Sequence, residues 1–414
     1  MSDSEPNQRL GRFMETPVGG EIVRAFVPPP LPPVPAIDVL ELLDRLSLAE
    51  RALGRLDGIT MLLPRQELFL YMYVRKEAVL SSQIEGTQST LSDLLRFETE
   101  AQVGQPIDDI REVSNYVDAM MYGLERLQEL PLSLRLIREM HARLLQSGRG
   151  GTKDPGEFRR SQNWIGGTRP GNALYVPPPV TELDSCLGAF ERFMHEDKSR
   201  LPALIKAGLL HVQFETIHPF LDGNGRIGRM LITLLVEHWG LLDQPLLYPS
   251  LAFKRRQQEY YERLAAVRTQ GDWEGWTAFF LECVTEAAED AVQVAGGLFR
   301  IVSDDRARLL NSGSATLNTI RLLEALPEHP VMTLPRVIEL LGIAKPTASR
   351  CIDDLAGAGI LREMTGKQRD RVYIYEKYMR QLTESSRSIE IGDALERLND
   401  RFGDALRRMA DKAE

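Results

Sequence analysis

Twelve residues, His218 to Arg229, combine side chains that could handle a phosphate group. The segment reads His-Pro-Phe-Leu-Asp-Gly-Asn-Gly-Arg-Ile-Gly-Arg. Its glycine-asparagine-glycine turn, Gly223 to Gly225, can point successive backbone N–H groups at an anion where a helix begins. Asp222 offers the hard oxygen ligand that Mg²⁺ prefers, and His218 is suited to general-base chemistry. The segment therefore predicts an anion site beside a base.

Two arginines follow the turn and extend this prediction. Arg226 and Arg229 are three residues apart, so we expect them on one face of the first helical turn, where two guanidinium groups can hold neighbouring phosphates. Each of these features is usually structural when it occurs alone. Together, within twelve residues, they are far more specific.

The flanking residues predict how the loop is held. Leu204, Ile205, Leu209 and Val212 recur at helical spacing, and Pro219 disfavours helical geometry for His218, so a helix should end near Ile217. The apolar run 230–236 predicts a second helix, which Gly240 can end. The loop is thus expected between two buried helices.

The segment from His218 to Arg229 resembles the Fic family motif at every motif position. The resemblance implies a protein adenylyltransferase that moves AMP from ATP to Ser, Thr or Tyr hydroxyls of target proteins, and that can modify itself. It implies His218 as the base, Asp222 as the Mg²⁺ ligand and Arg229 as the partner of the γ-phosphate. The groups expected to orient the α- and β-phosphates are Gly223, Asn224, Gly225 and Arg226. Tyr260 and Tyr261 are candidates for the adenine pocket, with core packing as the open alternative.

The resemblance extends beyond the loop. About 31–95 resembles the N-terminal Fic-associated region, while Arg111 to Tyr116 and Gly156 to Arg159 resemble the body of the fold. Between Glu157 and Pro179, two extended runs around a glycine-rich turn predict a β-hairpin. In the family this hairpin is a flap that pairs with the target backbone. The flap residues expected to meet a target are Trp164, Ile165, Gly166, Leu174 and Tyr175.

A second motif predicts a brake. The stretch 77–86 should be a helix ended by Gly86, and Glu85 in its last turn opposes the helix dipole, which predicts a cationic partner. Ser81, Glu85 and Gly86 resemble the inhibitory helix of the family. The resemblance implies that Glu85 pairs with Arg229 in place of the γ-phosphate and that Ser81 orients Glu85. In some relatives this glutamate positions water for AMP removal, so the direction of the reaction stays open.

The C-terminal part, 315–380, resembles a winged helix-turn-helix domain. The sequence Lys345 to Arg350 opens the candidate recognition helix, where major-groove contact is common. The segment from Lys345 to Arg371 contains six basic and four acidic residues. Its excess of positive charge is small for a DNA-binding surface. DNA binding and protein interaction both stay open. The alternative function is a DNA-binding regulator whose Fic fold senses a nucleotide.

Composition sets the outer limits. The 414 residues are 43% hydrophobic and 26% charged, with a net charge of −9, as expected for a multidomain globular protein. Without a membrane-length apolar run or a signal-peptide core, we expect a cytoplasmic protein with three reduced cysteines. The expected fold is mainly α: a Fic helical core with a short hairpin flap, then a winged helix-turn-helix. The expected parts are a proline-rich arm (1–36), a helical region (37–110), the catalytic core (111–300), a linker (301–314), the winged helix-turn-helix (315–380) and an amphipathic tail helix (381–414) suited to forming a homodimer.

Overall fold

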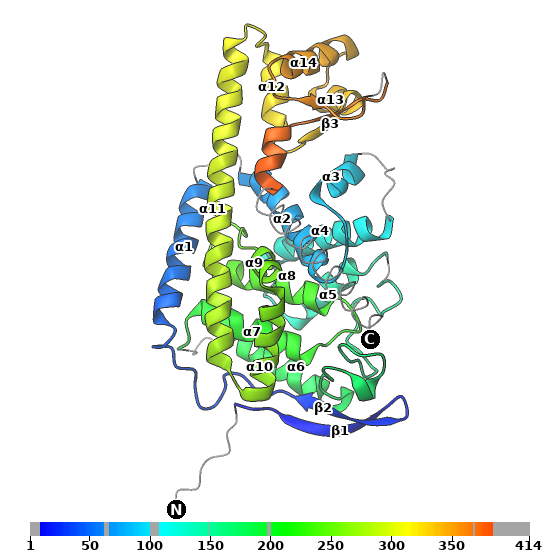
Figure 1. The fold of residues 1–414 in the computed structure, drawn as a ribbon, viewed down its shortest axis with the longest axis vertical. Helices are drawn as coiled ribbons and strands as arrows, with labels where there is room; N and C mark the ends of the chain where they lie inside the picture. The colour runs from blue at the N-terminus through cyan, green and yellow to red at the C-terminus, as the bar shows by residue number, and fades with distance from the viewer. Residues whose placement is uncertain are drawn as a thin grey trace, which may run out of the picture. The chain divides into compact units, whose positions relative to one another are not determined.

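The computed structural model describes residues 9–61, 66–99, 107–148, 150–196, 200–366 and 369–383. Its contacts divide the chain into two compact units, Met1–Val292 and Gln293–Glu414 (Figure 1). The fold is mainly helical, as predicted. No helix in the described ranges is long and apolar enough to cross a membrane. The predicted tail helix, 381–414, lies almost entirely outside the described residues.

The first unit begins with a β-hairpin where only a proline-rich arm was expected. Strands β1 (Arg12–Val18) and β2 (Glu21–Val27) pair antiparallel around Gly19 and Gly20. Both glycines have positive φ, 57° and 84°, which suits a two-residue hairpin turn. The proline stretch follows β2 without regular structure, as expected. The hairpin was missed because neither strand carries a clear alternating pattern: β1 buries no residue, and β2 buries Val23 and then Ala25 to Val27 in succession.

Four helices follow the proline stretch, and the last of them continues past residue 110, where the helical region was expected to end. They are α1 (Leu43–Met61), α2 (Gln66–Ile84), α3 (Leu91–Thr99) and α4 (Ile107–Leu127). Helix α2 ends at Ile84, so Glu85 and Gly86 form the turn after it, with Gly86 at φ 98°. Ser81, Glu85 and Gly86, the residues predicted to form the brake, therefore lie at the C-terminal end of a helix that packs against α4, α8 and α9.

The centre of the first unit is a pair of buried helices. Its further helices are α5 (Leu134–Leu144), α6 (Val180–Met194), α7 (Ala203–Ile217), α8 (Asn224–His238), α9 (Ser250–Arg255) and α10 (Gln257–Gln270). Helix α7 is buried on every side and α8 over most of its length, as expected of core helices. The predicted end of α7 at Ile217 is confirmed. The 218–223 loop is thus held at both ends by rigid core.

The predicted flap hairpin is much smaller than expected. A single antiparallel bridge joins Ile165 to Tyr175, and a short 3₁₀ turn (η1, Pro170–Asn172) lies between them. The runs on either side form no strands, because the prolines from 177 to 179 cannot donate ladder hydrogen bonds. The structure therefore has a small flap closed by one bridge.

Helix α11 (Trp273–Asn311) replaces most of the expected linker, 301–314. The polar composition of this segment suggested a hinge, but its polar residues cover the exposed face of a helix. Asp305 and Leu309, four residues apart, are buried. Within the first unit α11 lies beside α1 (Figure 1), where Arg45 and Arg55 of α1 pair with Glu282 and Glu289.

The second unit contains the helices and the small sheet expected of a winged helix-turn-helix domain. Its elements are α12 (Leu317–Ala325), β3 (Val331–Thr333), α13 (Leu334–Leu341), α14 (Lys345–Gly357), β4 (Arg362–Glu363) and β5 (Val372–Ile374). The sheet order is β3-β5-β4. Thr333 caps α13, since its hydroxyl accepts a hydrogen bond from the amide of Arg336. Strand β3 was missed because three residues carry too little pattern.

Candidate active site

His218 is the residue that ends α7. It adopts a left-handed backbone conformation, φ 49°, and its amide still donates to the carbonyl of Phe214 at 2.9 Å. Burial lowers the pKa of His218 to about 4, against the opposing effects of the Glu215 backbone and the Glu85 charge. The imidazole is therefore neutral at pH 7 and can accept a proton.

The loop after His218 is braced by Asn224, the first residue of α8. Its side-chain amide accepts from the amide of Phe220 at 2.8 Å and donates to the carbonyl of the same residue at 2.9 Å. Asn224 is buried. This differs from the expected role in orienting phosphates, because both ends of its amide already hold the loop.

The predicted anion site lies at the start of α8. Gly223 precedes it with φ 78°, and Gly225 lies in its first turn. A Cβ on Gly225 would come 2.2 Å from Glu85 Oε1. The carboxylate of Glu85 therefore lies against the N-terminus of α8, in the space that only a glycine leaves open. An anion of the chain itself occupies the position that suits a phosphate oxygen.

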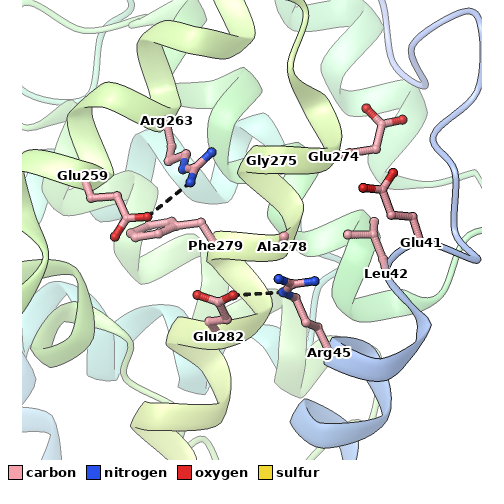
Figure 2. A pocket seen from close by; sticks show the side chains of 10 residues that line it. All are labelled: Glu41, Leu42, Arg45, Glu259, Arg263, Glu274, Gly275, Ala278, Phe279 and Glu282. Atoms are coloured by element: carbon pink, nitrogen blue, oxygen red, sulfur yellow. Dashed lines mark hydrogen bonds and ion pairs between the residues drawn. The ribbon is translucent and has the colours of Figure 1, made fainter.

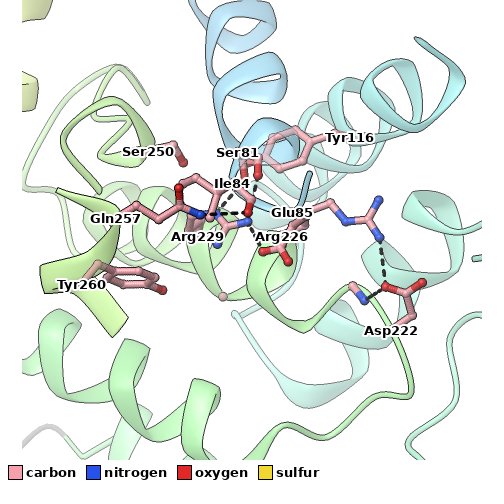
Figure 3. A network of polar contacts seen from close by, with 12 residues as sticks. Ser81, Ile84, Glu85, Tyr116, Asp222, Arg226, Arg229, Ser250, Gln257 and Tyr260 are labelled. Atoms are coloured by element: carbon pink, nitrogen blue, oxygen red, sulfur yellow. Dashed lines mark hydrogen bonds and ion pairs between the residues drawn. The ribbon is translucent and has the colours of Figure 1, made fainter. Parts of the chain in front are cut away.

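Arg229 is the cationic partner predicted for Glu85. Its Nη2 lies 2.6 Å from Glu85 Oε1, and its side chain is 1% exposed. Figure 3 shows Arg229 directed at the end of α2. Ser81 differs from the prediction: its Oγ accepts from Arg229 Nε at 2.8 Å and its carbonyl accepts from Nη2 at 3.0 Å. Ser81 thus positions the arginine, while the ion pair positions the glutamate.

Arg226 and Arg229 point apart, contrary to the predicted phosphate clamp (Figure 3). Arg226 Nη2 lies 3.2 Å from Asp222 Oδ1, and its Nη1 lies 3.5 Å from a carboxylate oxygen of Glu112. Its side chain is 5% exposed. The three-residue spacing did not decide the direction, because Asp222 and Glu112 hold Arg226 on one side while Glu85 holds Arg229 on another.

Asp222 can still serve as a metal ligand. Its side chain is 40% exposed, and Arg226 and the amide of Gly223 use only Oδ1. Among the described residues, no group of three His, Cys, Asp or Glu side chains could hold a metal. One carboxylate oxygen fits Mg²⁺ bound mainly by nucleotide phosphates and water, and does not fit an all-protein metal site.

The two tyrosines of α10 differ from each other. Tyr260 is 1% exposed, and its hydroxyl lies 2.9 Å from His211 Nε2, whose other ring nitrogen contacts the carbonyl of Gly228. Tyr260 is therefore a core residue, and the alternative of core packing is confirmed. Tyr261 is 46% exposed, and a Tyr261 ring remains free to meet a nucleotide base.

The predicted flap residues are of two kinds, those exposed to solvent and those that support the flap from inside. Trp164, Ile165 and Leu174 are exposed, by 39%, 36% and 87%. Gly166 has φ 67°, and a side chain there would collide with Leu174. Tyr175 points inward, and its hydroxyl donates to the carbonyl of Thr216 at 2.7 Å. Tyr175 is thus a support of the flap, and the apolar residues form its outer edge.

A cavity of about 220 Å³ lies between α1, α10 and α11 (Figure 2). Its charged lining residues are Glu41, Arg45, Glu259, Arg263, Glu274 and Glu282. Two of its carboxylates are paired within it, Glu282 with Arg45 at 2.9 Å and Glu259 with Arg263 at 3.4 Å. No motif residue lines this cavity, so it is separate from the candidate active site.

Comparison with protein families agrees with this geometry. Residues 43–125 match the Fic/DOC family N-terminal model, and residues 131–236 match the Fic/DOC family model. The chain carries a Fic domain. Residues 315–364 match the IclR helix-turn-helix domain, which confirms the predicted class of the C-terminal domain.

The Fic domain is similar to known adenylyltransferases over part of their length. The protein adenylyltransferase Fic of Drosophila virilis is 30% identical over 263 residues, 62% of this chain and 49% of that protein. Its Drosophila grimshawi counterpart is 31% identical over 213 residues, 50% of this chain and 40% of that protein. The chain thus spans about half the length of the curated relatives it matches or less. A Fic family protein from Desulfovibrio desulfuricans G20 shares the fold, with a TM-score of 0.53 at 20% identity over 81% of this chain and 95% of that one.

Three residues that support the 218–223 loop were not predicted from the sequence as site residues. His141 stacks on Phe220 with ring centroids 3.7 Å apart, and its Nε2 lies 3.0 Å from the carbonyl of Asp222. Arg159 and Asn163 both donate to the carbonyl of His218, at 3.1 and 3.3 Å. Each lies more than 50 residues before its partner, so no local pattern indicates the contact.

Glu215 is a fourth missed residue. It is buried on α7 one turn before His218. A Cβ on Gly228 would lie 2.4 Å from Glu215 Oε1, so the carboxylate packs against this glycine. Burial raises the pKa of Glu215 to about 7. The glutamate is therefore a buried carboxyl beside Gly228 of the Fic motif, with a raised pKa.

Proposed function

We propose that the chain transfers AMP from ATP to a hydroxyl side chain of target proteins. The observation that carries the proposal is the start of α8, where the Glu85 carboxylate lies against Gly225 and Arg229, directly after the loop that begins with the neutral imidazole of His218. A helix N-terminus and a buried guanidinium are suited to a polyphosphate. The adenylyltransferase relatives of the Fic domain support ATP as the donor.

His218 is the proposed base. Its neutral ring accepts the proton of the target hydroxyl as the hydroxyl oxygen attacks the α-phosphate of ATP. The bond from the α-phosphorus to the bridging oxygen breaks, and pyrophosphate leaves with that electron pair. The amide of Gly225 and the side chain of Arg229 stabilise the phosphate charges, so catalysis is positioning together with electrostatics.

Asp222 is the proposed ligand of Mg²⁺. When bound, the ion neutralises charge on the phosphates of ATP. The residues around it fit this role, since Arg226 contacts only Oδ1 of Asp222 and the Asp222 side chain is 40% exposed. Arg226 therefore serves the site by orienting Asp222.

Glu85 is the proposed brake. It already pairs with Arg229 and lies against Gly225, so a γ-phosphate and Glu85 compete for the same guanidinium. ATP can then bind with its γ-phosphate in place only when Glu85 moves away. The same competition applies to self-modification.

The test is AMP incorporation by the full chain. We expect Glu85→Gly to raise incorporation from labelled ATP at least about tenfold, because it frees a buried arginine from its ion pair. His218→Ala in the Glu85→Gly background should abolish it. Intact mass after incubation with Mg²⁺ and ATP checks that the gain is AMP. Equal incorporation by the wild type and Glu85→Gly would refute the brake, and incorporation without His218 would refute the base.

The second unit supports a second candidate function, binding of duplex DNA. The observation that favours it is the match to an IclR helix-turn-helix domain, whose second helix, α14, exposes Lys345, Thr347 and Arg350. These side chains lie in its first two turns, where helix-turn-helix proteins contact base edges.

A further inference from the structure

Strand β2 lies against the segment that carries the flap. The amide of Phe26 donates to the carbonyl of Val176 at 2.9 Å, directly after the bridge at Tyr175. Val23 and Ala25 of β2 form a buried apolar cluster with Val176, and Val18 and Ala173 pack against it. The hairpin and the flap therefore share one small core.

The two turns are also in contact. Arg169, before η1, forms an ion pair with Glu21 at the start of β2. Gly171 leaves room for that glutamate, since a Cβ on Gly171 would lie 2.1 Å from Glu21 Oε2. A Cβ on Gly19 would lie 3.9 Å from the ring of Pro170. The turn of the hairpin thus supports the turn of the flap.

Tyr175 extends this support to the catalytic loop. Its ring centroid lies 6.4 Å from that of Phe26. Its hydroxyl donates to Thr216, two residues before His218, and the guanidinium of Arg268 lies 4.1 Å over its ring. One side of this tyrosine therefore contacts the hairpin, and the other contacts the helix that ends at the candidate base.

From these contacts we infer that the hairpin β1–β2 is a positioning element for the acceptor protein. The inference rests on the proposed AMP transfer. The hairpin holds the flap, whose exposed residues Trp164, Ile165 and Leu174 would meet a target, at a fixed distance from His218. A displacement of about 1 Å between reacting groups can cost about 100-fold in rate. The hairpin thus acts on the transfer step and leaves ATP binding unchanged.

The first experiment measures amide hydrogen exchange in the full chain. Val23→Asp places a charge in the core that the hairpin and the flap share. Ile22→Asp is the matched control, because Ile22 directly precedes Val23 on the same strand and is 75% exposed. We expect exchange at Ile165 and Tyr175 to be at least about tenfold faster in Val23→Asp and unchanged in Ile22→Asp. Unchanged exchange in a folded Val23→Asp variant would overturn the inference.

The second experiment measures function in the Glu85→Gly background. Adding Val23→Asp should lower self-incorporation of AMP at least about tenfold while the Kd for ATP with Mg²⁺ stays within about twofold. Equal losses in ATP affinity and incorporation would overturn the inference. If Glu85→Gly alone incorporates no AMP, the proposed function fails, while the exchange experiment still decides whether the hairpin holds the flap.

If Val23→Asp does not fold, exchanging the charges of the Glu21–Arg169 ion pair tests the inference instead. Glu21→Arg places a second arginine beside the exposed Arg169, so the two charges repel, and it leaves the apolar core shared by hairpin and flap unchanged. We expect it to speed flap exchange by about two- to fivefold, and Glu21→Arg with Arg169→Glu to restore the original rate. Failure of the double variant to restore the rate would overturn the inference.

Discussion

The residue with the most direct consequence for chemistry is His218. Its lowered pKa, about 4, comes first from burial at the end of α7. Glu85 raises that pKa, so removing Glu85 lowers it further. The base form is therefore the main form throughout the neutral range, in contrast to an exposed histidine that titrates near pH 6.5.

This predicts the pH profile of the released enzyme. With saturating ATP and Mg²⁺, AMP transfer by Glu85→Gly should change by less than about twofold between pH 6 and pH 8 and fall only below about pH 5, because His218 gains its proton there. The measurement is initial incorporation of labelled AMP against pH. A severalfold rise between pH 6 and pH 8 would contradict the neutral, buried base.

His141 gives a prediction about stability. His141→Ala should cost about 3 kcal/mol, because it leaves the buried amide of Gly156 and carbonyl of Asp222 without their partner and removes the stacking on Phe220. We expect Tm to fall by roughly 6–12 °C in calorimetry. The exposed His195, at the end of α6, is the control, and an equal effect of His195→Ala would contradict a special role for His141.

At the scale of elements, the end of α2 is held in place by its neighbours. Lys254 of α9 donates to Gln83, and Gln257 of α10 donates to the carbonyl of Ile84 at 3.2 Å. These contacts come directly before Glu85. The proposed brake is therefore a helix end that two neighbouring helices hold against Arg229.

Loss of one such contact should release the brake in part. Gln257→Ala removes a hydrogen bond of about 0.5–1.5 kcal/mol, so we expect AMP transfer to rise about two- to tenfold. The adjacent Gln258 bonds only Glu262 on its own helix among the contacts described, so Gln258→Ala should leave the rate unchanged. Comparison of both variants with wild type and Glu85→Gly checks this, and a Gln257→Ala rate no higher than wild type would refute it.

At the scale of the whole molecule, the chain joins two compact units through one helix. Helix α11 begins in the Fic unit and ends after the boundary at Val292. The net charge of −9 opposes general polyanion binding. If the chain binds DNA, a local surface must therefore carry the contact, and the helix-turn-helix match makes the second unit the place to test.

That surface can be tested separately from catalysis. If α14 contacts DNA, Lys345→Glu with Arg350→Glu should weaken duplex binding and reduce its salt slope by about 2. AMP transfer should be unaffected. Arg321→Glu, an exposed change on α12, is the control. Titration of labelled duplex at several salt concentrations measures the slope, and an unchanged slope in the double variant would exclude α14 as the contact.

The sequence by itself determined the features that local backbone chemistry decides. Pro219 ends α7 at Ile217, Gly223 precedes α8, and Thr333 caps α13. Each signal acts within a few residues through allowed φ and ψ or through a missing or added hydrogen bond. The ion pair of Glu85 with Arg229 was also within reach, because an acidic helix end needs a cation and the family motif named one.

Only the tertiary structure decided which way the site residues point. Asn224 bonds Phe220 and Arg226 bonds Asp222, each only four residues away, but Glu112 beside Arg226 and His211 beside Tyr260 come from other helices. The support of the flap by β2 and of the loop by His141 joins segments far apart in the chain. Spacing fixes the neighbours of a residue on its own helix, but the packing of distant segments fixes what its side chain meets.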